Sequence, residues 1–368
     1  MEVAKRNYGL DLLRIVSMFL VVNLHVLSQG GVMVRITGQE STYYASWFIE
    51  TCAYCAVNCY GLLSGYVGVD SKFRPARLLE LWCQVFFYSA GITLIFWLVS
   101  PELLMENSLW KAIFPIGWKT YWYFSAYAGL FFMMPYLNRL VLALKEAERK
   151  RMALMMFLVF SVFTALPKVN DSDFLSLVGG YSFVWLVILY LFGACLKKCS
   201  FRRWKKWQYL LAYFGLVTFS WAFKILVENY TRKVYGEPRF GRMFTGYAAP
   251  TILLCGVCLL LIFEGIHVEK KWAQKLIAVA SPLAFSVYLI HTHPLIWDNL
   301  ISGLFSEYRN IKLIPLVMGA VLLSAAAIYV VCSLLDLIRF QIFRVIGVRR
   351  RSELLVDTVK KRIESRKK

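Results

Sequence analysis

The chain has 368 residues, of which 59% are hydrophobic and 17% are charged, and its 42 Lys and Arg against 22 Asp and Glu give a formal net charge of +20. Soluble domains carry about 45–50% apolar and about 25% charged residues, so this composition excludes an ordinary cytosolic enzyme, a disordered chain and a secreted disulfide scaffold. We expect an all-α polytopic integral membrane protein whose basic residues are sorted to one side. No soluble segment is long enough to present a basic face, so we expect no nucleic-acid partner.

Apolar stretches recur along the whole chain. A membrane-spanning helix needs about 20 predominantly apolar residues, and we predict ten spans, of which the fifth and sixth are short. They are residues 9–28, 45–68, 79–99, 121–142, 152–167, 181–196, 208–227, 246–264, 276–297 and 312–338. The connections between them are brief, so we expect no inserted soluble domain.

The distribution of Lys and Arg predicts the orientation of the spans, because cytoplasmic loops are enriched in these residues. If the N-terminus is cytoplasmic, the segments on the inner side carry most of the Lys and Arg, and both termini lie inside. We divide the chain into a transmembrane domain, 1–340, and a basic cytoplasmic tail, 341–368. Leu355, Val359 and Ile363 could line one face of a tail helix on an anionic leaflet; a solvated basic tail is the alternative.

The first span contains three ionisable side chains, Asp11, Arg14 and His25. Such groups inside a membrane are costly and mark functional sites by default. Arg14 and His25 are separated by almost three helical turns, so they share one face and lie about 16 Å apart along the axis. Asp11 is close enough in sequence to hold the Arg14 guanidinium, and His25 is the residue best suited to exchange a proton near neutral pH. The charges also interrupt the apolar run, so we expect the segment to be retained rather than cleaved as a signal peptide.

A basic cluster follows the second span, where Arg74 and Arg77 bracket a proline and Lys72 lies just before them. Positive charge on the inner side explains these residues without any further role. The functional alternative is a phosphate-binding site, because guanidinium groups match phosphate oxygens in a bidentate fashion. Such a site would face the cytoplasm, where phosphorylated donors are found.

The cysteines lie in apolar stretches, and the clusters among them are Cys52, Cys55 and Cys59, and Cys255 and Cys258. Spacings of three and four place these small side chains on one helix face, which favours close packing. A metal site of this kind requires polar turns and a second pair of ligands. We therefore predict a packing role and no metal.

Five motifs in this order resemble the membrane acyltransferase-3 family, whose members O-acylate glycans and related molecules outside the cytoplasmic membrane. They are Arg14-x10-His25, Leu63-Ser64-Gly65-Tyr66, Arg74-Pro-Ala-Arg77, Tyr121-Trp122-Tyr123-Phe124 with Pro135 further on, and Ser286-Val287-Tyr288-Leu289-Ile290-His291. The resemblance runs from about residue 7 to 340. It implies about ten helices around a central conduit in a bacterial inner membrane, in a stand-alone form without a periplasmic hydrolase-like domain.

The resemblance also implies roles for the ionisable residues. Acyl-CoA, with acetyl-CoA as the expected donor, would enter from the cytoplasm, and Arg74 and Arg77 would bind its phosphates together with Lys72. Arg14 would lie along the donor path, and His25 would act as the general base or as a transient acyl carrier. The acceptor would be a hydroxyl of a cell-surface glycan, an exopolysaccharide or a lipid-linked precursor.

Acyl transfer to a hydroxyl also requires donors that stabilise the oxyanion. Candidates for this role or for substrate contact are Asp11, Ser64, Trp122, Tyr123, Tyr288 and His291. Family members often have His followed directly by Pro, whereas this chain reads His291-Thr-His293-Pro, so the family role falls on one of the two. A transporter or flippase is the alternative function, although the expected internal repeat is not visible. Membrane lipids are expected partners, and the oligomeric state is open.

Overall fold

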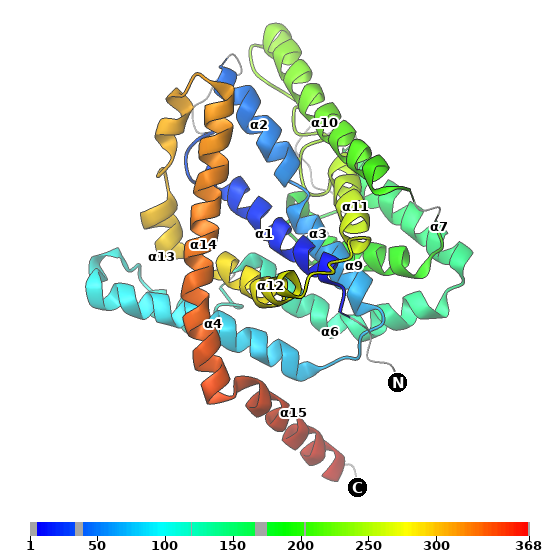
Figure 1. The fold of residues 1–368 in the computed structure, drawn as a ribbon, viewed down its shortest axis with the longest axis vertical. Helices are drawn as coiled ribbons and strands as arrows, with labels where there is room; N and C mark the ends of the chain where they lie inside the picture. The colour runs from blue at the N-terminus through cyan, green and yellow to red at the C-terminus, as the bar shows by residue number, and fades with distance from the viewer. Residues whose placement is uncertain (1–5, 34–39, 119, 166–174, 202–203, 367–368) are drawn as a thin grey trace.

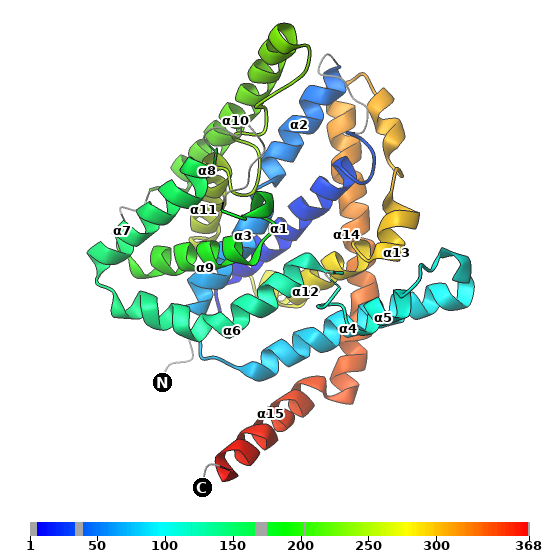
Figure 2. The ribbon, with the colours of Figure 1, turned by 180° about the vertical axis from the view of Figure 1, so that it is seen from behind.

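The computed structural model describes residues 6–33, 40–118, 120–165, 175–201 and 204–366. Figure 1 shows these residues as a bundle of helices, several of which cross at steep angles. Figure 2 shows the same bundle from behind, with the amino-terminal helix enclosed by the others. No strand occurs in the described ranges.

The helices are α1 (Tyr8–Leu27), α2 (Ser41–Ala53), α3 (Ala56–Gly68), α4 (Pro75–Val99), α5 (Ser108–Ile113), α6 (Trp122–Ala143), α7 (Glu146–Phe157), α8 (Phe163–Ala165), α9 (Phe183–Lys198), α10 (Lys206–Tyr235), α11 (Pro250–Glu264), α12 (Lys271–His291), α13 (Pro294–Ile296), α14 (Ile314–Ile346) and α15 (Val348–Ser365). Short 3-10 turns cover Pro101–Leu103, Val178–Gly180 and Ser306–Asn310, and π-helical turns cover Leu158–Val162 and Trp297–Ile301.

Six helices in the described part of the chain are long and apolar enough to cross a membrane, namely α1, α4, α6, α10, α12 and α14. The chain is therefore a multi-pass membrane protein of helical class. The other four predicted spans fall on shorter helices. The span at 45–68 consists of α2 and α3, which are interrupted at Tyr54 and Cys55, and the spans at 181–196 and 246–264 correspond to α9 and α11. The fifth, 152–167, covers the end of α7, a π-turn and α8, and its last two residues lie outside the described ranges.

Helix α1 occupies the centre of the bundle. It contacts α2, α3, α11, α12 and α14, and most of its residues are buried, whereas most residues of α4, α10 and α14 are not. The side chain of Asn7 caps α1 by accepting a hydrogen bond from the amide of Leu10, and its amide group donates to the carbonyl of Glu264 at the end of α11. Of the ionisable residues of α1, Asp11 is buried, and Arg14 and His25 are partly exposed.

The tightest helix contact joins α3 and α9 and depends on glycine. A Cβ at Gly65 would lie 1.8 Å from the carbonyl oxygen of Tyr190, and a Cβ at Gly193 would lie 1.9 Å from that of Leu62. Small residues let helix backbones approach closely where no hydrophobic effect drives association. The glycine of the Leu63–Tyr66 motif therefore has a packing role. The cysteines of α3 and α11 are also buried in the core, as the sequence predicted, and all nine cysteines are free.

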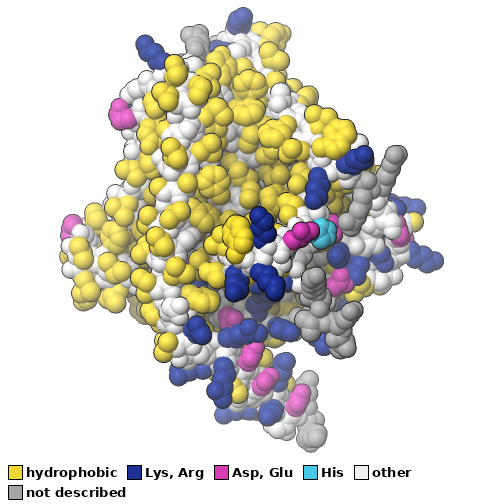
Figure 3. All heavy atoms as spheres, in the orientation of Figure 1, with side chains coloured by type: hydrophobic (Ala, Val, Ile, Leu, Met, Phe, Trp, Pro, Cys, Tyr) yellow, Lys and Arg dark blue, Asp and Glu magenta, His cyan; other side chains and the backbone are white. Residues whose placement is uncertain are grey.

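Basic side chains gather at one end of the molecule. Figure 3 shows hydrophobic side chains over α10, α2 and α14, and Lys and Arg side chains around α15 and the part of the bundle next to it. The beginning of α1 and the end of α15 both lie toward this end (Figure 1). The arrangement is compatible with the predicted orientation, and the side of the membrane on which both termini lie stays a prediction.

The first residues of the tail continue α14 as far as Ile346, and Val348–Ser365 form a separate helix, α15. Gly347, with a φ of 70°, ends α14 and starts α15 at an angle to it. Ser352 in the first turns of α15 is buried, and this part of the helix packs against α4. Leu355, Val359 and Ile363 are exposed, so the face that they form has no protein partner in the described structure.

Candidate active site

Two histidines from distant parts of the sequence meet where α1 and α12 end. His25 lies in the last turn of α1, and His291 is the last residue of α12. Nδ1 of His25 lies 2.8 Å from Nε2 of His291, and the ring centroids are 5.0 Å apart. His291 is buried, whereas His25 is partly exposed. The contact therefore holds one imidazole in place and leaves part of it accessible.

The hydrogen-bond network determines which ring nitrogens carry a proton. Nδ1 of His291 lies 2.5 Å from the carbonyl oxygen of Val287, which can only accept, so this nitrogen donates. In a neutral ring Nε2 of His291 must then accept, and it accepts from Nδ1 of His25. Nε2 of His25 is left with a free lone pair. This assignment gives His25 the form of imidazole that can take a proton.

Trp297 packs against His25 from the other side. Its ring centroid lies 4.7 Å from that of His25, and the two planes are nearly perpendicular at 88°. Trp297 begins a π-helical turn, and its carbonyl accepts a hydrogen bond from the side-chain amide of Gln29. The amide of Gly303 donates to the carbonyl of Gln29 at 2.9 Å. The end of α1 and the segment after α13 are thus joined around His25.

The second histidine of the His-Thr-His-Pro sequence has a different position. Nδ1 of His293 accepts a hydrogen bond from the amide of Leu295 at the start of α13. Its Nε2 lies 3.2 Å from the carbonyl oxygen of Ser89 and 3.4 Å from the hydroxyl of Thr93, both on α4. His293 therefore caps one helix and connects it to another, whereas His291 contacts His25. Of the two residues that the sequence left open, the structure brings only His291 to His25.

The other end of α1 carries a buried ion pair. Asp11 is buried and accepts hydrogen bonds from Arg14, Arg6 and the hydroxyl of Ser281 on α12. The pairing of Asp11 with Arg14 that the sequence predicted is present, and the Arg14 side chain is 31% exposed. Because Asp11 meets Ser281 and His25 meets His291, α1 and α12 run in the same direction and are connected at two levels.

Aromatic side chains from three helices lie along this pair of helices. Tyr60 on α3 donates its hydroxyl hydrogen to the carbonyl of Arg14 at 2.7 Å. The ring centroid of Tyr123 on α6 lies 6.0 Å from that of Tyr60 and 6.4 Å from that of Tyr288 on α12. Trp122 contacts Tyr123 at 5.6 Å. Of the predicted substrate candidates, Trp122, Tyr123 and Tyr288 thus form one continuous group, with Tyr288 one helical turn before His291.

Ser64 is less suited to stabilise an oxyanion. Its hydroxyl donates to the carbonyl of Tyr60 in the preceding turn at 2.8 Å, and its backbone amide belongs to the middle of α3, where it takes part in the helix. The side-chain and amide donors are therefore already in use, and the motif around Ser64 contributes chiefly through the packing of Gly65.

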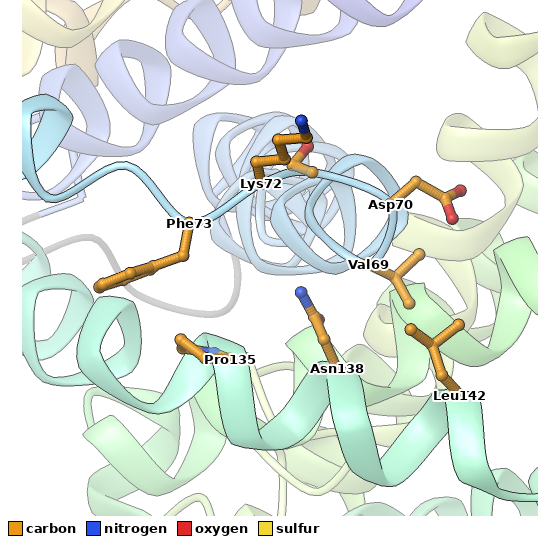
Figure 4. Close-up of a pocket in the computed structure, with 8 residues that line it drawn as sticks. Val69, Asp70, Lys72, Phe73, Pro135, Asn138 and Leu142 are labelled. Carbon is orange, nitrogen blue, oxygen red and sulfur yellow. The ribbon is translucent and has the colours of Figure 1, made fainter. Parts of the chain in front are cut away.

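The basic residues before α4 lie at the surface. Lys72, Arg74 and Arg77 are all exposed, as a site for a large soluble donor requires. Lys72 lines a shallow hollow of about 360 Å³ between the loop 69–73 and the exposed side of α6, where Pro135 and Asn138 form the opposite wall (Figure 4). Arg74 and Arg77 are not part of its lining.

Three contributions to this arrangement were not predicted from the sequence: Trp297, the carbonyl of Val287 and the Tyr60 hydroxyl. The aromatic character of Trp297 at a span end was the one available signal, and it is shared by many residues of the chain. No three His, Cys, Asp or Glu side chains in the described ranges are grouped so that they could hold a metal ion.

The fold and these contacts define a class: a helical multi-pass membrane protein in which two parallel helices, α1 and α12, bring two imidazoles together at their carboxyl-terminal ends. A buried ion pair lies near the amino-terminal end of α1. A comparison with known families matches residues 7–336 to acyltransferase-3, described as an acyltransferase domain. The chain therefore belongs to the acyltransferase-3 family and is a membrane acyltransferase. Family membership favours this function over the transporter or flippase that the sequence left as the alternative. No curated protein and no solved structure matches it.

Proposed function

We propose that this enzyme transfers an acyl group, acetyl being the expected one, from cytoplasmic acyl-CoA to a hydroxyl of a cell-surface glycan, an exopolysaccharide or its lipid-linked precursor, in a bacterial cytoplasmic membrane. The observation that carries the proposal is the hydrogen-bonded pair of His25 and His291, which leaves a lone pair on Nε2 of His25. Family membership supports O-acyl transfer in general. The donor, the acceptor and the residue roles are the proposed part.

In the proposed reaction, Nε2 of His25 removes the proton of the acceptor hydroxyl as the oxygen attacks the thioester carbonyl. The tetrahedral intermediate then expels the CoA thiolate, which takes the proton back from the imidazolium, so that an ester and CoA thiol are formed. His291 acts as a positioning residue, because its Nε2 accepts from Nδ1 of His25 and fixes the reactive tautomer. Its role is that of an orienting partner in a catalytic triad.

The developing oxyanion needs hydrogen-bond donors. The hydroxyls of Tyr123 and Tyr288 are the proposed donors, since both rings lie in the aromatic group one turn before His291. The Tyr121 hydroxyl already donates to the carbonyl of Leu289. Exclusion of water by this aromatic group would also limit hydrolysis of the thioester.

On the donor side, Arg74 and Arg77 would bind the phosphates of CoA with Lys72. Their exposure supports this role. Arg14, held by Asp11, would lie between this cluster and His25 on the path of the acyl thioester. A central conduit that joins the two ends is part of the proposal.

The test uses membranes that contain the enzyme, its surface glycan and acetyl-CoA labelled in the acetyl group. Replacement His25→Ala should lower transfer to the glycan by about 10²–10⁴-fold, the usual contribution of a general base. The matched control is His267→Ala, which changes an exposed histidine in a loop and should retain wild-type transfer. Equal transfer by His25→Ala and the wild type would refute the proposed mechanism.

Two further measurements address the donor and the chemical route. Acetyl-CoA should raise the unfolding temperature of the wild type but not of Arg74→Ala/Arg77→Ala. Lys270→Ala/Lys271→Ala, which changes two basic residues where α12 begins, should respond as the wild type does. Label that stays on the protein in the absence of glycan, and is lost in His25→Ala, would assign His25 as an acyl carrier rather than a base.

A further inference from the structure

A second cluster of polar and aromatic side chains lies outside the histidine site, on one face of α2. Tyr43, Trp47, Glu50 and Tyr54 follow one another at intervals of four, three and four residues, so they form a single stripe along the helix. This stripe faces α10, because Trp47 contacts Lys224 and Tyr43 donates its hydroxyl hydrogen to Glu228. None of these residues takes part in the contacts of His25.

Glu50 is the unusual member of the stripe. Its exposed fraction is 6%, and it lies within a predicted membrane span, where a carboxylate is expensive unless it has a function. Tyr54 follows it by about one helical turn, and Oε2 of Glu50 has no hydrogen-bond partner among the described residues. A buried acceptor without a partner in the protein requires an explanation, and a donor supplied by a bound ligand is one.

The nearby cations do not satisfy this oxygen. Lys224, itself buried, forms an ion pair with Glu228, and its ammonium group lies 3.6 Å from the centroid of the Trp47 ring. Arg242, in the loop after α10, is exposed and acts electrostatically on Glu50 and Tyr54. Lys224 is thus already paired inside the cluster, whereas the Arg242 guanidinium is exposed to solvent.

A row of aromatic rings connects Glu50 with the histidine site. Ring centroids are 5.7 Å apart for Tyr54 and Tyr247, 4.8 Å for Tyr247 and Tyr181, and 4.8 Å for Tyr181 and Trp122. Tyr181 is 50% exposed, so the row is open to the outside in its middle. Trp122 continues it through the aromatic group described above to the helical turn that precedes His291.

The backbone at this point is also interrupted, since α2 ends at Ala53 and α3 begins at Ala56. Broken helices at membrane depth are tolerated where they are buried in protein or line a ligand site. The interruption lies directly after the stripe, next to Tyr54. Three independent features, namely an unpaired buried carboxylate oxygen, a partly open aromatic row and a broken span, therefore coincide.

We propose that Glu50, Arg242, Tyr54, Tyr181 and Trp122 form a binding subsite for the saccharide acceptor. This inference rests on the function proposed above and adds the part of the enzyme that selects the acceptor. Oε2 of Glu50 accepts hydrogen bonds from sugar hydroxyls, the guanidinium of Arg242 binds polar groups at the entrance, and the aromatic rings pack against the apolar faces of the sugar units. A saccharide laid along the rings extends toward His25.

The experiment measures initial rates of acetyl transfer from labelled acetyl-CoA in membranes, with the native surface glycan as the probe at increasing concentrations. Glu50→Gln preserves the shape of the side chain but replaces one of the two carboxylate oxygens by an NH2 group, which is a donor. It should raise KM for the glycan at least 10-fold. Stabilisation of the enzyme by acetyl-CoA should be unchanged. Tyr181→Ala should also raise KM, whereas Tyr181→Phe, which retains the ring, should remain within twofold of the wild type.

The matched control is Glu237→Gln, which changes an exposed carboxylate in the loop after α10, the loop that also contains Arg242. This variant should behave as the wild type. An unchanged KM in both Glu50→Gln and Tyr181→Ala would overturn the subsite. A fall in kcat alone, or a loss of the response to acetyl-CoA, would show that Glu50 has a proton-transfer or packing role and would equally overturn it. Since the histidine variants are assayed separately, full activity of His25→Ala would instead refute the proposed function.

Discussion

The contact between the two histidines leads to a prediction about rate that does not depend on knowing the acceptor hydroxyl. In His291→Phe the ring is retained, but Nδ1–H of His25 loses the acceptor that lies 2.8 Å away. Loss of this acceptor costs about 1–3 kcal/mol, and the cost falls chiefly on the transition state, in which the His25 ring gains a positive charge and its hydrogen bond strengthens. Since about 1.4 kcal/mol corresponds to a factor of ten in rate, we expect kcat to fall roughly 5–150-fold, less than for His25→Ala.

The same change should leave KM for acetyl-CoA unaltered, because His291 lies at the far end of α12 from the basic cluster before α4. His291→Gln provides the matched rescue, since its side-chain oxygen can accept a hydrogen bond in place of Nε2 and should restore most of the activity. The assay is a steady-state measurement of labelled acetyl transfer, with His267→Phe as a control for substitution of an exposed histidine. Activity of His291→Phe within twofold of the wild type would refute the assignment of His291 as a positioning residue.

Three other predictions concern stability and the tail. Gly65→Ala should destabilise the protein by about 3 kcal/mol or more, because its Cβ would lie 1.8 Å from a carbonyl oxygen of α9. Thermal unfolding in detergent measures this loss, and Gly215→Ala, whose Cβ would have no neighbouring atom within 4 Å, is the control. Glu228→Gln should cost about 3–5 kcal/mol in the same assay, since it leaves the buried ammonium of Lys224 unpaired. Trypsin should cleave α15 more slowly in vesicles with phosphatidylglycerol than with phosphatidylcholine alone, and Val359→Asp should remove this difference.

Each of these has a clear contrary result. Equal unfolding temperatures for the two glycine variants would show that α3 and α9 can separate without cost. A Glu228→Gln protein as stable as the wild type would mean that the Lys224 ammonium is satisfied elsewhere. Cleavage of α15 that is independent of lipid charge would favour the solvated tail.

Local periodicity explains which features could be predicted. Asp11, Arg14 and His25 lie on one continuous helix, so residue spacing alone indicated that Asp11 reaches Arg14, and the structure contains this pair. The choice between His291 and His293 could not be made in the same way. It depends on where α12 ends, and the turn at residue 292 directs the two imidazoles to different neighbours.

Glu50 and Lys224 show a limit of a different kind. Both are ionisable residues inside predicted spans, so the rule that singled out Arg14 applied to them as well. Glu50 has no neighbour of opposite charge in its span, whereas Lys224 precedes Glu228 by four residues, a spacing that would have allowed this pair to be predicted. Their surroundings depend on contacts between α2, α10 and the following loop. The interruption of the helix at Tyr54 and Cys55 likewise contains no glycine or proline that would indicate a break in the sequence. The second span was therefore expected to be a single helix.

The hydrogen bond from Nδ1 of His291 to the carbonyl of Val287 has a consequence for the path of protons. A peptide carbonyl cannot take up a proton and hand it onward, so the chain of donors that begins at His25 stops there. In the proposed reaction the His25–His291 pair therefore holds the proton for a short time and does not relay it to another group. The proton taken from the acceptor hydroxyl must leave through the same nitrogen, Nε2 of His25, to the sulfur of the departing CoA. Deprotonation of the acceptor and protonation of the released CoA are therefore coupled in every turnover.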